Sequence, residues 1–132
     1  MDGLLLRSAD HSIFLHPPEA YPDNHGFHHR VDLLAGPFQG AIDATSYESV
    51  KTLRRFHDEL TTLYRRLKGE AHLGAGYENL TLELKGDGRG HFKVDVAAWA
   101  GDSMDTRLSY AFTIDQTQLP AAIASLAKFA RL

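Results

Sequence analysis

Residues 78–98 constrain the fold more than any other stretch of this 132-residue chain, because they read as a β-hairpin with one apolar and one polar face. Leucine occupies every second position over residues 80–84, and apolar side chains occupy every second position over residues 92–96. A glycine-rich segment, residues 86–90, separates the two runs. A period of two on each side of such a turn predicts two antiparallel strands, with the apolar side chains facing a core.

Further strands are predicted on both sides of this hairpin. Short apolar runs near the N-terminus are expected to pair as a first hairpin, and prolines after them enforce an irregular loop. The strand that follows the central hairpin alternates as clearly as the hairpin does. The additional strands predicted are residues 4–7, 12–16, 31–35, 38–42, 70–73 and 106–114.

Two amphipathic helices are also predicted. The first is expected over about residues 47–68, since Thr45 and Glu48 have the spacing of a capping box. The second begins near residues 115–117, with Pro120 in its first turn, where a missing N–H costs nothing. Apolar residues recur at threes and fours in both. The predicted stripes are Val50, Leu53, Phe56 or His57, Leu60, Leu63, Tyr64 and Leu67, then Leu119, Ile123, Leu126 and Ala130.

Together these elements predict an α+β fold: an antiparallel sheet of about six or seven strands with both helices packed on one face. We expect a single domain over residues 1–132, because the length is close to the commonest domain size. Residues 1–46 would supply N-terminal strands and a loop. Residues 47–132 would supply a helix, a three-stranded meander and the C-terminal helix.

Composition narrows the classes of function. The chain has no cysteine, which excludes disulfides, thiolate metal sites and a cysteine nucleophile, and fits a reducing compartment. Its net charge of -3 argues against nucleic-acid binding, which needs a basic surface. The N-terminal apolar run is only three residues long, so we expect neither a signal peptide nor a membrane span. These features predict a cytoplasmic protein without nucleic-acid or membrane partners.

Histidines gather in one segment, at His25, His28 and His29, with His16 upstream. Zinc takes imidazole ligands, and an open site with three protein ligands is catalytic. However, His28 and His29 would point to opposite faces of a strand, and no carboxylate stands at a defined helical spacing. We therefore predict a solvated polar loop with no metal or cofactor. A small-molecule- or metal-binding domain built on residues 25–30 stays as an alternative.

No other motif carries catalytic chemistry. The glycines of residues 87–90 precede a strand, whereas phosphate-binding glycine loops precede a helix, so they are interpreted as turn residues with positive φ. Arg54 and Arg55 of the first helix have Asp58 and Glu59 at i+4, so the arginines of this helix are typical of a solvated helix face. Glu83 and Asp95 share a sheet face but lie beside lysines, as ordinary solvated carboxylates do. Nothing resembles a nucleophile motif, so we expect a protein that is not an enzyme.

The polar face of the central hairpin is the surface most in need of an explanation. The two helices account for the apolar face, but nothing accounts for the row of charges on the other. If the alternation continues, Trp99 joins this row, where an exposed tryptophan is typical of an interface anchor. Alternatively, the strand ends before Trp99 or another segment covers the ring. The predicted partner-binding residues are Glu83, Lys85, Lys93, Asp95, Trp99, Asp102 and Asp105.

A succession of short motifs resembles a known family. In chain order these are Phe56 and Leu60 in an F-x-x-x-L core, Gly69-Glu70-Ala71, Tyr77-Glu78-Asn79-Leu80, Gly88-Arg89-Gly90-His91 and Asp115-Gln116-Thr117-Gln118-Leu119-Pro120. From about residue 47 onward the chain is similar to small bacterial proteins that resemble the immunity partner of wall-associated-protein toxins. Residues 1–46 show no match.

The resemblance implies a cytoplasmic, non-enzymatic protein that binds a cognate toxin domain and blocks its active site or substrate surface. It supplies no catalytic residues. Inhibitors of nucleases are often strongly acidic, and a net charge of -3 departs from that pattern, which argues against a nuclease partner. A local acidic patch would still arise from Glu83, Asp95, Asp102 and Asp105. A structural homo-oligomer that pairs edge strands or the sheet face is the other alternative, and the oligomeric state is not determined by the sequence.

Overall fold

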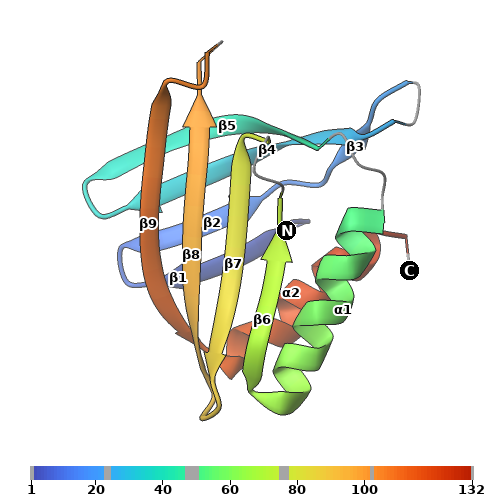
Figure 1. Cartoon of the computed structure of the whole chain (residues 1–132), viewed down its shortest axis with the longest axis vertical. Coiled ribbons are helices and arrows are strands. Elements are labelled where there is room, and N and C mark those ends of the chain that lie inside the picture. Colours follow the sequence, from blue (N-terminus) through green and yellow to red (C-terminus); the bar gives the residue numbers. More distant parts are fainter. Residues whose placement is uncertain (1, 23–24, 47–50, 75–77, 102, 132) are drawn as a thin grey trace.

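The computed structural model describes residues 2–22, 25–46, 51–74, 78–101 and 103–131. Within these ranges the chain forms nine strands and two α-helices (Figure 1). In order they are β1 (Leu4–Ser8), β2 (His11–Leu15), β3 (Glu19–Ala20), β4 (Phe27–Ala35), β5 (Phe38–Ser46), α1 (Lys51–Arg66), β6 (Lys68–Leu73), β7 (Leu80–Asp87), β8 (His91–Ala100), β9 (Thr106–Asp115) and α2 (Leu119–Phe129), with a 3₁₀ turn η1 (Gln116–Gln118) before α2.

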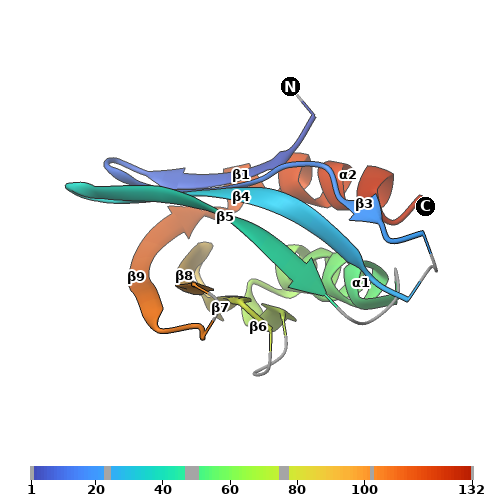
Figure 2. The ribbon, with the colours of Figure 1, turned by 90° about the horizontal axis from the view of Figure 1, so that it is seen from above.

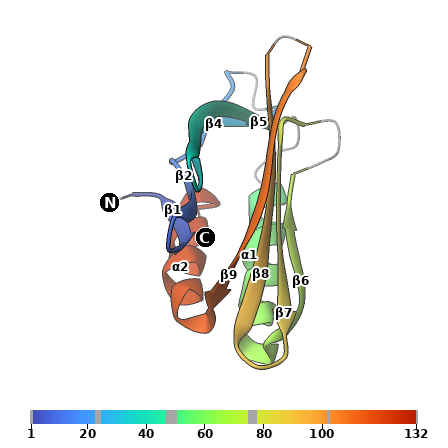
Figure 3. The same cartoon turned by 90° about the vertical axis from the view of Figure 1, so that its left-hand side faces the viewer.

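The strands belong to two antiparallel sheets. In the N-terminal sheet, β4 pairs with β2 and β3 along one side and with β5 along the other, and β1 pairs with β2. The C-terminal sheet has the order β6-β7-β8-β9. Figure 3 shows the two sheets as separate layers, and in Figure 1 their strands run across one another. The α+β class is therefore confirmed, but the strands form two sheets, where one sheet of six or seven strands was expected.

The difference has a physical cause. Alternation predicts which face of a strand is apolar, but it does not say which sheet the strand joins. Here α1 separates β5 from β6 in the chain, and the strands before and after it pair only among themselves. Each sheet then covers part of the apolar face of the other, so the two helices do not have to cover nine strands alone.

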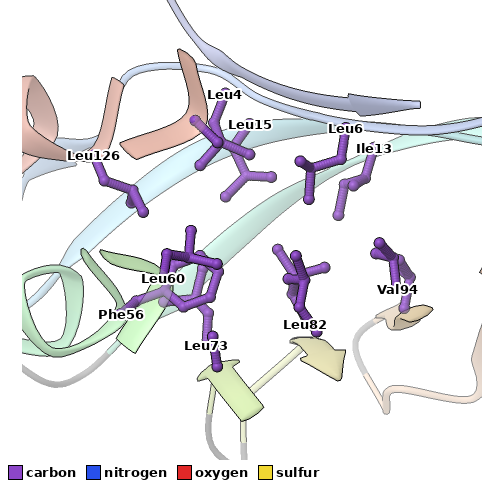
Figure 4. Packing of buried hydrophobic residues seen from close by; sticks show 14 of the residues in the cluster. Leu4, Leu6, Ile13, Leu15, Phe56, Leu60, Leu73, Leu82, Val94 and Leu126 are labelled. Atoms are coloured by element: carbon purple, nitrogen blue, oxygen red, sulfur yellow. The ribbon is translucent and has the colours of Figure 1, made fainter. Parts of the chain in front are cut away.

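The core lies between the two sheets. On one side β9 approaches β1 and β2, and on the other side α1 packs on β6 while α2 packs on both α1 and β1 (Figure 2). Figure 4 shows apolar side chains of the two sheets and of the helices pointing into the same space. Those labelled there are Leu4, Leu6, Ile13, Leu15, Phe56, Leu60, Leu73, Leu82, Val94 and Leu126, and all are buried.

The helices follow the predicted stripes closely. Helix α1 buries Thr52, Leu53, Phe56, Leu60 and Leu63. Tyr64, expected in the stripe, is 42% exposed, and the predicted residues Glu48 and Val50 lie outside the described ranges. Helix α2 buries Leu119, Ala122 and Leu126, has Pro120 in its first turn, and leaves Ile123 partly buried. No helix in the described part of the chain is long and apolar enough to cross a membrane.

The turn between β7 and β8 confirms the interpretation of its glycines. Gly88 and Gly90 have φ values of +83° and +99°, a region that favours glycine because a Cβ atom would be strained there. An oxygen of Asp87 accepts hydrogen bonds from the backbone N–H groups of Arg89 (2.7 Å) and His91 (3.2 Å). These bonds hold the pKa of the Asp87 carboxyl below its ordinary value. The Asp87 carboxylate therefore satisfies backbone N–H groups within its own turn.

Candidate binding face

The outer face of the C-terminal sheet brings together five of the predicted residues, four of which stand opposite one another in pairs. In the β7–β8 register Glu83 stands opposite Asp95, and Lys85 stands opposite Lys93. The two lysines are exposed and the two acids partly exposed, while the residues between them in sequence point into the core. The period-two pattern thus places these four side chains as the sequence predicted.

Strand β6 adds two side chains to this face that sequence reasoning missed, Glu70 and His72. The Glu70 carboxylate lies 3.8 Å from the Lys85 ammonium, and a ring nitrogen of His72 lies 3.7 Å from the Glu83 carboxylate. The pairing of β6 with β7 puts them in register with these residues. Their signal was present, since they alternate with the buried Ala71 and Leu73, but the strand is only six residues long.

Most charges on this face have an opposite charge beside them. Besides the contacts from β6, the Lys93 ammonium lies 3.7 Å from the Asp95 carboxylate. Directly opposed lysines repel each other, so these acids offset the repulsion between Lys85 and Lys93. Exposed ion pairs contribute about 0–1 kcal/mol each. Such pairs are exchanged for contacts with another protein at little cost.

Trp99 lies on the same face, as the continued alternation predicted. Strand β8 extends to Ala100, so it does not end before the tryptophan, and Arg107 of β9 stands opposite it. The guanidinium carbon of Arg107 lies 5.0 Å from the centroid of the Trp99 ring, within the range of a cation–π contact. The Arg107 Nε also donates a 2.9 Å hydrogen bond to the Ser109 hydroxyl. Arg107 thereby holds the ring in place while leaving it partly exposed.

The structure describes one of the two predicted loop aspartates. Asp105 is exposed and immediately precedes β9, and Asp102 lies outside the described residues. A shallow hollow of about 370 Å³ runs over the middle of the sheet. Its lining includes His72, Thr81, Glu83, Asp95, Arg107 and Ser109.

The geometry of Glu83 and Asp95 suits recognition better than acid–base chemistry. Their side chains are 38% and 48% exposed, so water solvates both carboxylates. A carboxyl that acts as a general acid near neutral pH is usually held in a buried, apolar site. Here His72 and Lys93 stand beside the two acids instead. The face can therefore offer alternating charges, hydrogen bonds and one aromatic ring to another surface.

His28 and His29 belong to strand β4 and not to the solvated polar loop that was predicted, and they lie on opposite faces, as expected for neighbours on a strand. His28 is partly exposed, stacks on Tyr21 and contacts the Asp43 carboxylate at 3.3 Å. His29 is buried, its Nδ1 lies 3.1 Å from the His16 carbonyl oxygen, and burial lowers its pKa. Across the described ranges, no group of three or more His, Cys, Asp or Glu side chains could hold a metal ion.

Comparison with known proteins adds a family and a fold. Residues 8–131 match the model of the Immunity protein WapI-like family, which extends the resemblance into the N-terminal strands. No curated protein matches. Among solved structures, the one titled "Structure of the plant transcriptional regulator PBF-2" matches with a TM-score of 0.52 and 11% identity, over 97% of this chain and 79% of that one. At that identity the likeness shows the fold alone.

Proposed function

The chain belongs to the WapI-like immunity protein family, and we propose that it is an immunity-type inhibitor that binds and blocks a cognate toxin domain. The family match over nearly the whole chain is the observation that carries this proposal. Inhibition by binding requires no chemistry from the inhibitor, in keeping with a protein that acts without catalysis. The cytoplasm is the compartment in which such an inhibitor would protect the cell that makes it.

We place the contact with the toxin on the outer face of the C-terminal sheet, called the binding face below. Its side chains project from strands whose other side is packed in the core, so they are held in position before a partner arrives. Preorganised side chains lose little conformational entropy on binding. The proposed contact residues are Glu83, Lys85, Lys93, Asp95, Trp99 and Asp105, together with Asp102, which the structure does not describe.

Trp99 and Arg107 form the proposed anchor of this contact. Tryptophan and arginine are enriched among interface residues whose truncation costs 2 kcal/mol or more. A partner that covers the ring would also desolvate the guanidinium above it, which strengthens their cation–π contact. The charges around them would set the orientation of the partner, because each acid and base favours its opposite.

The mixed sign of the binding face indicates the kind of toxin surface it fits. Lysine and acid alternate along β7 and along β8, and Glu70 of β6 lies beside Lys85, so both signs lie close together even though like charges face each other between β7 and β8. A complementary surface would carry both signs. This favours a toxin domain whose contact surface is not a strongly basic nucleic-acid cleft.

Co-purification with the toxin domain encoded by the adjacent reading frame tests the function. We expect a stable complex from the tagged immunity chain, and its absence would refute the proposal. The site is tested separately with Trp99→Ala and Lys93→Glu in titration calorimetry. A loss of about 2 kcal/mol, or roughly 30-fold in Kd, is expected for Trp99→Ala.

Matched variants away from the binding face serve as controls. Tyr64→Ala removes another partly exposed aromatic ring, from α1, and Arg54→Glu reverses an exposed charge on the same helix. Both should bind like the parent. If all four variants bind alike, the inhibitor function stands but the contact lies on another surface.

A further inference from the structure

Strand β5 forms an open edge of the N-terminal sheet. Among the described residues only β4 pairs with it as a strand. Proteins usually protect such edges with charges, bulges or very short strands. Here the nine-residue strand has no charge from Phe38 to Ile42, and Phe38 is 66% exposed. The edge is therefore a surface that favours pairing with another strand.

The hydrogen bonds of Asn79 show which backbone groups face outward from this edge. The Asn79 side chain donates to the Asp43 carbonyl and accepts from the Thr45 N–H, each at 2.9 Å. Asp43 and Thr45 therefore point away from β4. Because backbone groups alternate in direction along a strand, Gln39 and Ala41 also point outward.

The opposite strand gives the same assignment. Arg30 stands opposite Asp43, and its carbonyl accepts a hydrogen bond from His16 on the far side of β4. Arg30 and Asp43 thus form a pair without mutual hydrogen bonds, as the antiparallel pattern requires when both point outward. Between Gln39 and Asp43, the groups of the edge without a hydrogen bond to the described residues are the N–H and C=O of Gln39 and Ala41 and the N–H of Asp43.

We propose that two copies of this chain pair through β5, antiparallel, about a two-fold axis that passes through Gly40. In this register Gln39 of one copy faces Ala41 of the second, and the two residues exchange both backbone hydrogen bonds. Asp43 faces Pro37 of the second copy. Pro37 has a carbonyl but no N–H, while Asp43 has a free N–H and a carbonyl already bound by Asn79. From Pro37 to Asp43, each outward backbone group is thus either matched or already satisfied.

The side chains also match in this register. Phe38 of one copy lies opposite Ile42 of the second, on the apolar face of the sheet, which covers an aromatic ring that is otherwise exposed. On the other face Gln39 lies diagonally across from Asp43 of the second copy, within reach of an amide-to-carboxylate hydrogen bond. At the centre two glycines meet, so no side chain separates the strands. An isologous contact of this kind closes on itself as a dimer.

Self-pairing explains the edge better than an unrelated strand does. A generic extended peptide would carry an N–H opposite the Asp43 carbonyl, which Asn79 already occupies, and would need its own apolar residue for Phe38. The chain's own segment, residues 37–43, supplies a proline and an isoleucine at those two positions. The proposal does not depend on the toxin, so it is tested with the purified chain alone.

Charge exchange at Gly40 tests the register. The backbone there is not in a glycine-only conformation, and an added Cβ would have no atom within 4 Å, so Gly40→Lys and Gly40→Glu should both fold. Like charges directly opposite each other across two strands are destabilising. Light scattering should give twice the monomer mass for the parent and the monomer mass for each variant. An equimolar mixture of the two variants should return to the dimer mass.

Thr113→Lys and Thr113→Glu place the same charges on an exposed position of β9 and should remain dimers. A parent chain of monomer mass at the highest soluble concentration would overturn the proposal. So would a dimer that persists in both Gly40 variants, or a mixture that fails to reassociate. If the parent is a monomer and Gly40→Lys abolishes binding of the toxin domain, the edge receives a strand of the toxin instead, and self-pairing is refuted.

Discussion

The hairpins β7–β8 and β4–β5 share an alternating sequence pattern but differ in how far their inward-facing side chains are buried. In β7–β8 every inward side chain is buried, from Leu80 to Ala98. In β4–β5 burial is complete along β4 but fades along β5, from the buried Ala44 to the exposed Phe38. Figure 2 shows the tip of the β4–β5 hairpin reaching past the C-terminal sheet.

Neighbours account for the difference. Strands β7 and β8 are flanked by β6 and β9 and covered by the opposite sheet and the helices, so both their edges and their apolar face are occupied. Among the described residues, β5 pairs with one strand only, and it projects beyond the layer that would cover it. An alternating pattern therefore specifies where a side chain points. The surrounding strands and helices determine whether that side chain is buried and how much it stabilises the fold.

The largest expected effect is at the covered hairpin. Phe92 is fully buried in β8, so Phe92→Ala removes a ring from a packed core and leaves a cavity. Substitutions of this kind cost about 3–5 kcal/mol. Urea denaturation should show this loss as a lower midpoint with an unchanged slope. A loss below about 1 kcal/mol would mean that the covered hairpin is not packed as described.

A smaller effect is expected at the link between the two hairpins. Asn79 precedes β7 and its side chain makes two hydrogen bonds to the backbone of β5. Each such bond contributes about 0.5–1.5 kcal/mol, so Asn79→Ala should cost about 1–3 kcal/mol in urea denaturation. Asn79→Asp keeps the acceptor for the Thr45 N–H but loses the donor to the Asp43 carbonyl. Its stability should therefore lie between those of the parent and of Asn79→Ala. An unchanged stability in both variants would show that water replaces the amide fully.

The strands and helices were largely predictable, because their signals are local. Alternation in β7, β8 and β9 and the stripe of α1 depend only on nearby residues. The division into two sheets was not predictable in the same way. Contacts such as that of the Tyr110 hydroxyl with the Ser12 carbonyl join residues 98 positions apart, and no local pattern records them.

For the candidate site, too, the sequence predicts side-chain directions but not side-chain contacts. The direction of Glu83, Lys85, Lys93, Asp95 and Trp99 follows from alternation, and the structure places all five on one face. What each side chain contacts depends on which strand lies beside it. The ion pair of Glu70 and the position of Arg107 over the tryptophan ring became visible only with the register of β6 and β9.

The pH dependence of stability should distinguish the two hairpins further. His29 in β4 is buried and its pKa is lowered, chiefly by burial, against the raising effects of the His16 carbonyl and of Asp43. The unfolded chain then binds its proton more readily, since an ordinary histidine pKa is about 6.5. The stability that neutral His29 contributes to the folded state is therefore fully present above that pH. It is lost as the pH falls from about 6.5 toward the lower pKa of His29 in the folded protein.

Urea denaturation measured between pH 7.5 and pH 5 checks this pH dependence, because that range contains the ordinary histidine pKa of about 6.5. We expect His29→Gln to flatten the fall of stability with decreasing pH relative to the parent. His91→Gln removes an exposed histidine from the β7–β8 turn and serves as the control. Parallel profiles for the parent and His29→Gln would contradict the assignment of a buried, neutral His29.

The smallest expected effect on stability is at the open hairpin β4–β5. The substitution that tests it is the same one, phenylalanine to alanine, that has the largest effect in β7–β8. Phe38→Ala removes the same ring as Phe92→Ala, but from a side chain that is mostly in water. In the monomeric Gly40→Lys background its free energy of unfolding should change by less than about 0.5 kcal/mol. In the parent background the same substitution should weaken the dimer, since the ring then has Ile42 of the second copy to cover. A large loss in the monomer would show that Phe38 packs within its own chain, and the contrast between the two hairpins would fail there.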